Sequence, residues 1–76
     1  MTMINKVQEN IFEVVTVKGC VITVSFFDFG CVVYVPRSGY QFTVGKNFKS
    51  LTDAAASYKK ADIRDALLLL ADDLAA

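Results

Sequence analysis

The segment from Phe12 to Val44 constrains the fold most, because its apolar side chains recur with a period of two. The period is clearest from Cys20 to Phe26, where every second residue is apolar and lies on one side of an extended chain. β-Branched and aromatic residues also dominate 11–17, 31–35 and 40–44. The segment therefore predicts four consecutive strands in an antiparallel meander.

Three short connections set the predicted register. Residues 18–19 form a two-residue turn whose glycine accepts positive φ. Residues 27–30 form a four-residue loop, and Pro36 and Gly39 favour a tight return within 36–39. The pairs that these connections place opposite each other are Val15 with Ile22, Phe26 with Cys31, and Val35 with Tyr40.

This register gathers the apolar side chains on one face, since opposed residues share a face and a shift by one residue turns a strand over. A three-residue middle loop would divide the set between faces, which favours the four-residue loop. The predicted inward residues are Ile11, Val15, Val17, Cys20, Ile22, Val24, Phe26, Cys31, Val33, Val35, Tyr40, Phe42 and Val44. The predicted outward residues are Phe12, Val14, Thr16, Val21, Thr23, Ser25, Phe27, Val32, Tyr34, Gln41 and Thr43.

After a break at 45–47, the chain has a helical period. Ser50 and Asp53 have the spacing of a capping box, which predicts a helix that begins at Ser50. Two apolar stripes follow, and their directions differ by roughly 115° at 100° per residue. The sequence therefore predicts two helices, 50–59 and 62–75, with a single bent helix as the alternative. The stripes are Leu51, Ala54, Ala55 and Tyr58, then Ile63, Ala66, Leu67, Leu70 and Leu74.

The predicted fold is α+β, a four-stranded meander with two C-terminal helices packed on one face. A chain of 76 residues forms one domain, 1–76, because folding at this size buries only ~60% of the extended chain's surface. Residues 11–44 form the sheet and 50–75 its helical cover. Residues 1–10 fit a helical turn, a frayed end or a short strand.

The formal net charge is zero, so no overall field favours nucleic acid or an anionic membrane. The end of the chain is acidic, with four aspartates against Arg64 in 61–76. Cys20 and Cys31 are predicted to lie ~20 Å apart along the strands, too far for a disulfide. Reduced thiols and the polar character of 1–10, which lacks a signal-peptide core, predict a cytoplasmic protein.

The sequence offers no catalytic, cofactor-binding or metal-binding residues. Histidine is absent, which removes the commonest general base and metal ligand. The glycines occur singly at predicted turns, so none forms a phosphate-binding loop. Residues 28–30 have the letters of the kinase magnesium-binding motif, but the other kinase motifs are missing. We expect a protein that is not an enzyme.

Two surfaces remain as candidate binding sites. The second predicted helix carries Leu68 and Leu69 outside its inward stripe; either the first helix or the N-terminal segment covers Leu68, or these leucines form a second apolar surface. On the outer sheet face, aromatic side chains form a possible platform. The candidate partner-binding residues are Asp65, Leu68, Leu69, Asp72 and Asp73 on the helix, and Phe12, Phe27 and Tyr34 on the sheet.

These features predict a small non-catalytic protein-interaction module. Paired apolar and acidic surfaces suit a phage or mobile-element inhibitor of a host protein, of the anti-defence or anti-CRISPR type, which blocks a basic nucleic-acid-binding site. The first alternative is a homodimeric structural or assembly factor. The second is a single-stranded nucleic-acid binder that uses the outer sheet face, although few cations are available there.

Overall fold

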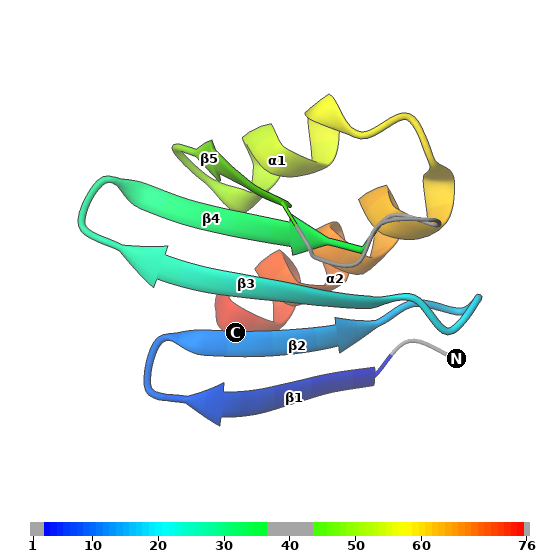
Figure 1. Cartoon of the computed structure of the whole chain (residues 1–76), viewed down its shortest axis with the longest axis horizontal. Helices are drawn as coiled ribbons and strands as arrows, with labels where there is room; N and C mark the ends of the chain where they lie inside the picture. The colour runs from blue at the N-terminus through cyan, green and yellow to red at the C-terminus, as the bar shows by residue number, and fades with distance from the viewer. Residues whose placement is uncertain (1–2, 37–43, 76) are drawn as a thin grey trace.

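A computed structural model of the chain describes residues 3–36 and 44–75. Its strands pair antiparallel in chain order, and two helices follow them, which confirms the α+β class (Figure 1). The described sheet has five strands rather than the four predicted. The elements are β1 (Met3–Gln8), β2 (Ile11–Val15), β3 (Val21–Phe27), β4 (Gly30–Val35), β5 (Val44–Phe48), α1 (Leu51–Ser57) and α2 (Ala61–Ala75).

The additional strand is β1, within the segment whose structure the sequence left open. It pairs with β2 from Met3 opposite Val15 to Gln8 opposite Ile11, with a bulge after Lys6. Of its side chains only Ile4 packs against the core, and the others are exposed. An edge strand with one inward contact has no clear burial period, which explains why its sequence did not predict a strand.

The turn between β2 and β3 is longer than predicted. The N–H of Thr16 donates to the carbonyl of Cys20 (2.9 Å), and the N–H of Gly19 donates to the carbonyl of Thr16 (2.9 Å). The Thr16 hydroxyl also accepts from the N–H of Cys20 (3.1 Å). These bonds close a three-residue loop, 17–19, whose last residue has φ 85° and is a glycine for that reason.

The longer loop shifts the first hairpin by one residue and turns β2 over. Val14, not Val15, lies opposite Ile22. The predicted orientation of β2 is therefore wrong: Phe12, Val14 and Thr16 face the helices. On β2 the residues Ile11 and Val15 lie on the opposite face, and Val17 is exposed in the loop.

The middle turn confirms the predicted pairing of Phe26 with Cys31. Pairing continues to Phe27 opposite Gly30, so the loop itself has only two residues. Gly30 has φ 145°, and a Cβ at this position would lie against the Phe48 carbonyl oxygen and 2.8 Å from the Lys49 Cα. A glycine is required because the end of β5 passes directly over this backbone.

The last strand differs from the prediction. Val35 lies opposite Val44 rather than Tyr40, and β5 runs through the segment expected to break the sheet. The predicted turn at 36–39, beyond Pro36, and residues 40–43 lie outside the described part of the chain. Gly45 fits a strand here because the Tyr34 ring occupies the space where a Cβ would be, 2.6 Å from its Cε1 atom.

The helices follow the predicted division. Ser50 caps α1, since its Oγ accepts from the N–H of Asp53 (3.2 Å), and α1 ends before Tyr58. Both apolar stripes are buried except at Leu74, which is 43% exposed, and Tyr58, which is half-buried. The buried apolar core consists of Val14, Ile22, Val24, Cys31, Val33, Leu51, Ala54, Ala55, Ile63, Ala66, Leu67 and Leu70.

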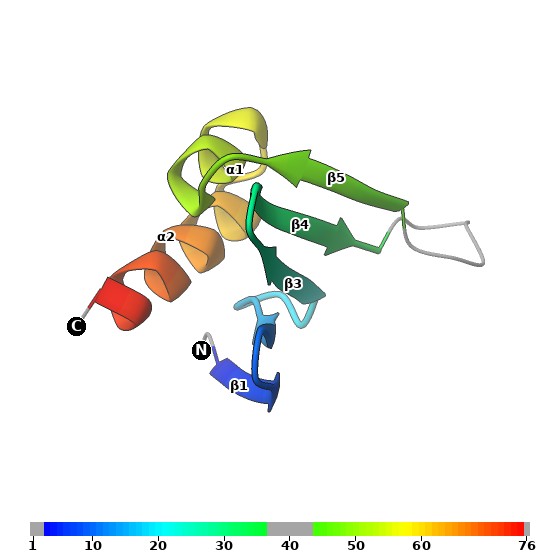
Figure 2. The same ribbon diagram turned by 90° about the vertical axis from the view of Figure 1, so that its left-hand side faces the viewer.

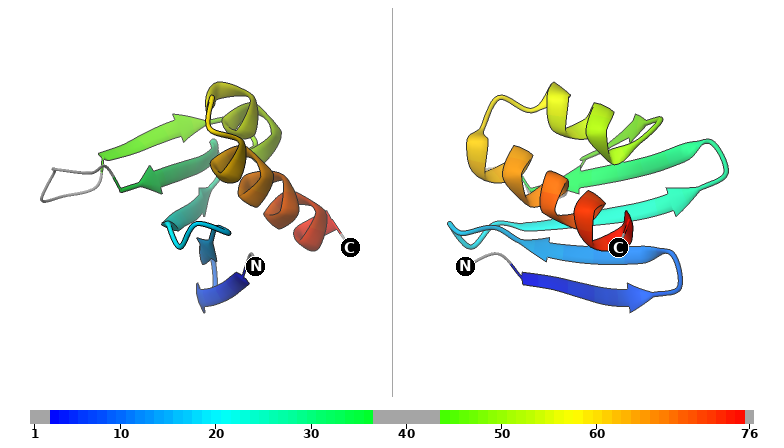
Figure 3. Two further views of the ribbon diagram at one scale, coloured as in Figure 1. Left: turned by 90° about the vertical axis from the view of Figure 1, so that its right-hand side faces the viewer. Right: turned by 180° about the vertical axis from the view of Figure 1, so that it is seen from behind.

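Both helices lie on the same side of the sheet, with α1 beside β5 and α2 crossing towards β2 (Figures 2 and 3). We call this covered side the inner face and the other side the outer face. Lys46 on β5 and Lys6 on β1 belong to the inner face by register, yet both are exposed. Inward-pointing charges on the two edge strands oppose edge-to-edge pairing with another sheet.

Substitution of Gly30 tests the close approach of β5 to the middle turn. We expect Gly30→Ala to lower the free energy of unfolding by about 3 kcal/mol or more, because it adds backbone strain and a clash with backbone atoms. Gly19→Ala is the matched control: its φ is 85° but nothing lies within 4 Å of the added Cβ, so about 1–2 kcal/mol is expected. Urea denaturation followed by circular dichroism measures both. Equal losses would contradict the close approach.

Candidate functional site

The outer face of the sheet has no helix over it in the described structure (Figures 1 and 3). Apolar side chains alternate on it with polar side chains that are almost all uncharged. Among the residues that the strand register places there, Glu13 is the only charged one. These residues are Met3, Asn5, Gln8, Ile11, Glu13, Val15, Val21, Thr23, Ser25, Phe27, Gly30, Val32, Tyr34, Gly45 and Asn47.

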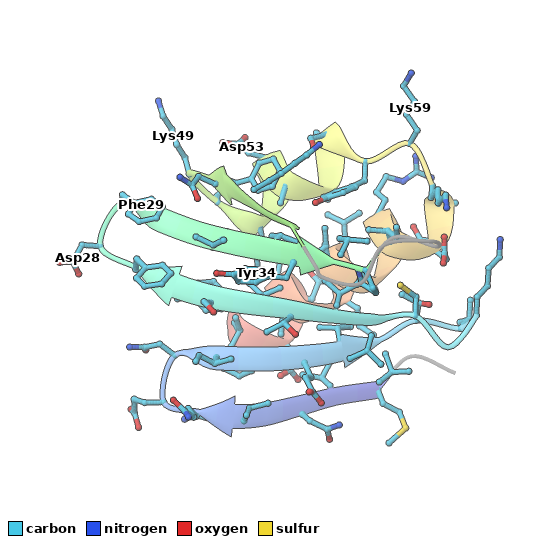
Figure 4. The ribbon with its side chains drawn as sticks, viewed as in Figure 1. Asp28, Phe29, Tyr34, Lys49, Asp53 and Lys59 are labelled. Atoms are coloured by element: carbon cyan, nitrogen blue, oxygen red, sulfur yellow. The ribbon has the colours of Figure 1, made fainter. Side chains whose placement is uncertain are left out.

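Two phenylalanine rings stand at one end of this face. Phe27 and Phe29 are stacked, with ring centroids 5.4 Å apart and planes 4° from parallel. Both rings are more than half exposed, Phe27 at 53% and Phe29 at 57%, and Phe29 lies at the middle turn in Figure 4. The two-residue loop 28–29 brings the rings together, since Phe27 is the last residue of β3 and Phe29 the second residue of the loop. We call them the Phe pair.

Tyr34 occupies the outer face of β4 (Figure 4). It lies opposite Gly45 in the register, and its ring covers the glycine backbone. The ring is half-buried in this position. Tyr34 thus extends the apolar surface towards β5.

The predicted aromatic platform of Phe12, Phe27 and Tyr34 is wrong for Phe12. Phe12 faces the helices and meets Phe26 edge-to-face, with centroids 5.7 Å apart and planes at 82°. Phe27 and Tyr34 lie on the outer face as predicted. The sequence analysis did not include Phe29 in the platform, because it assigned 27–30 to a four-residue loop. A two-residue turn at 28–29 would have predicted that Phe29 lies beside Phe27.

The other predicted surface lies on α2. Asp65, Leu68, Leu69, Asp72 and Asp73 are all exposed and share one side of the helix, because they are spaced three and four residues apart. Leu68 is 39% exposed and Leu69 43%, so neither side chain is fully covered by the rest of the described chain. The structure therefore favours the alternative in which these leucines form part of a second surface. We call these five residues the acidic stripe.

The acidic stripe has little internal neutralisation. Arg64 approaches Asp65 at 3.9 Å, but both side chains are well exposed, so this ion pair contributes little. No other salt bridge is present within the described part of the chain. Three carboxylates thus flank two exposed leucines on α2.

Neither thiol is disposed to act as a nucleophile. The two cysteines are free; Cys31 is buried and Cys20 half-buried. Burial, with a smaller contribution from Asp62, raises the pKa of Cys20 above its ordinary value of 9.0, and burial followed by Asp53 raises that of Cys31. Both are therefore protonated at neutral pH, and only the thiolate is reactive.

Within residues 3–36 and 44–75, no group of three or more acidic or cysteine side chains could hold a metal ion. No helix in the same part of the chain is long and apolar enough to cross a bilayer.

No protein-family model, curated protein or solved structure matches the chain. The arrangement of its surfaces is thus the basis on which a function can be proposed.

The thiols give a pH-dependent test of this structure. In a Cys31→Ala variant, we expect the alkylation rate of Cys20 by iodoacetamide to rise with a midpoint above pH 9.0, because burial disfavours the thiolate. In Cys20→Ala, we expect Cys31 to react only on unfolding, since it is 1% exposed. The unfolded chain ionises these thiols at lower pH, so the free energy of unfolding should fall as the pH rises above 9. Full reactivity of Cys20 at pH 7 would contradict this.

Proposed function

We propose that this chain is a non-catalytic protein-binding module that contacts its partner through the outer face of the sheet. The observation that carries the proposal is the Phe pair, which stacks in solvent beside an apolar face. Full burial of a phenylalanine side chain is worth ~1.5–3 kcal/mol, so a partner that covers both rings gains appreciable stabilisation. Aromatic residues are enriched at the centres of protein interfaces.

The distribution of charge supports a protein partner at this face. Interface centres are depleted in charged residues, and Glu13 is the one charged residue that the register places on the outer face. Single-stranded nucleic acid needs cations beside its stacking platform. Since Lys6 and Lys46 face the other side, the nucleic-acid alternative has little support at this surface.

The edges of the sheet support binding by the face rather than by strand addition. Added strands pair with an open edge, as in β-augmentation. Here Lys6 and Lys46 place inward charges on the two edge strands, which disfavours an approaching strand. The outer face, in contrast, has no lysine among the residues that the strand register places on it.

The acidic stripe supports a second candidate function. A phage or mobile-element inhibitor, including one of the anti-CRISPR type, would use these carboxylates to steer towards a basic surface and Leu68 and Leu69 to hold it. The specific support is that both leucines are exposed between aspartates. This finer function remains a prediction.

Capture from a bacterial lysate, followed by quantitative mass spectrometry, compares the two surfaces. We expect the double variant Phe27→Ser with Phe29→Ser to lose at least tenfold in recovery of a protein that wild type retains, as for an interface centre. The matched control, Asp72→Asn with Asp73→Asn, should retain it. Circular dichroism of each variant verifies folding.

If the aspartate variant loses recovery of the protein and the Phe variant does not, the binding surface is the acidic stripe on α2 rather than the outer face. Light scattering tests the homodimer alternative. A wild-type dimer that becomes a monomer in the Phe variant would show that the outer face binds a second copy. A dimer lost only with Leu69→Asp would place self-association on the acidic stripe.

A further inference from the structure

One end of the inner face contains a cavity of about 520 Å³. The link between α1 and α2 forms one wall, the end of β4 and part of β5 form another, and the turn between β2 and β3 completes it. Small-molecule sites commonly have volumes of about 300–1,000 Å³. The cavity lies on the opposite side of the sheet from the outer face, and two of its lysines, Lys18 and Lys60, also line a neighbouring hollow with Asp65 of the acidic stripe.

Lysines from three separate parts of the chain line this cavity. Lys18 comes from the first turn, Lys46 from β5, and Lys59 and Lys60 from the link. These are four of the eight basic residues in the chain, whereas Asp62 is the single acidic residue of the lining. Within the described residues none of the four forms an ion pair. Lys59 extends away from the body in Figure 4, so the candidate site consists of Lys18, Lys46 and Lys60.

Edge protection alone does not account for this arrangement. Lys46 has the same position on its edge strand as Lys6 on the other, and it approaches the Tyr58 ring, with Nζ 5.8 Å from the centroid. Of these two lysines, however, only Lys46 lines a cavity together with lysines from distant segments of the chain. Like charges repel, so an anion bound between lysines that line one cavity reduces their mutual repulsion.

We propose that this cavity binds a small organic phosphate, with the phosphate among Lys18, Lys46 and Lys60 and the organic part against Val35, Pro36 and Ile63. Lysine binds phosphate as a point charge through several N–H donors. The start of α2, whose residues Asp62 and Ile63 line the cavity, adds the positive end of a helix dipole.

The shape of the site favours a small ligand over a nucleic-acid strand. Proteins that bind single strands carry cations along a groove that follows several phosphates. Here the lysines surround one cavity with an apolar wall. A ligand with one phosphate and one compact apolar group uses both features, whereas inorganic phosphate uses only the first.

Titration of the ¹⁵N-labelled chain of 76 residues with phenyl phosphate tests this proposal by NMR. We expect saturable shifts of the amides of residues 18–20 and 58–63, with weaker binding of inorganic phosphate. Lys46→Gln and Lys60→Gln should each weaken binding about tenfold, since each removes a charge-assisted hydrogen bond to the phosphate. Bound phenyl phosphate should also slow alkylation of Cys20, which lines the same cavity.

Lys6→Gln is the matched control, because it removes the equivalent lysine from the other edge strand. An equal loss of affinity in Lys6→Gln would show general charge attraction and overturn the proposal. Equal affinity for inorganic and phenyl phosphate, or no saturation at tens of millimolar, would also overturn it. Tighter binding of a single-stranded oligonucleotide at the same amides would reassign the site to nucleic acid. If Lys46→Gln or Lys60→Gln fails to fold, Lys18→Gln takes its place in the titration, because Lys18 lies in an exposed turn and its substitution leaves the core unchanged.

Discussion

The hydrogen bonds between Thr16 and Cys20 determine the arrangement on which the other surfaces depend. By closing a three-residue loop, they set the register of β2 against β3 and so decide which side of β2 is buried. Phe12 and Val14 then contribute to the inner side, while Ile11 and Val15 are left on the outer face. This one loop therefore decides which apolar side chains β2 contributes to the uncovered face, because a register shift of one residue exchanges all side chains of a strand.

A net charge of zero conceals three surfaces of different chemistry. The outer face is nearly uncharged, with Glu13 as its one charged residue in the described strands. The exposed side of α2 is acidic, and the cavity beside the helix link is basic. Opposite charges on separated surfaces cancel in the total but produce local fields that partners and ligands meet. Each surface is therefore understood from its own residues rather than from the composition of the chain.

The lysines of the edge strands illustrate how one residue can serve the fold and a site together. Lys6 and Lys46 both place a charge on the helix side of an edge strand, where it opposes pairing with another sheet. Lys6 on β1 does not line the basic cavity, so edge protection is the one role that its position indicates. At β5 the link between the helices and the first turn bring further lysines to the same place, so Lys46 also belongs to a basic cavity.

The sequence by itself determined the features that depend on neighbouring residues: strand β3, the pairing of Phe26 with Cys31, the Ser50 cap and the break between two helices. Each has a local period or a local hydrogen bond. Only the tertiary structure decided the features that depend on distant contacts. The edge strands β1 and β5 lack a burial period, and the orientation of β2 depends on one turn residue. The Phe pair depends on the exact length of the middle turn, and the basic cavity requires segments that meet only after folding. The physical reason is that sequence periodicity reports burial on one element, whereas a binding surface depends on which elements leave a face uncovered.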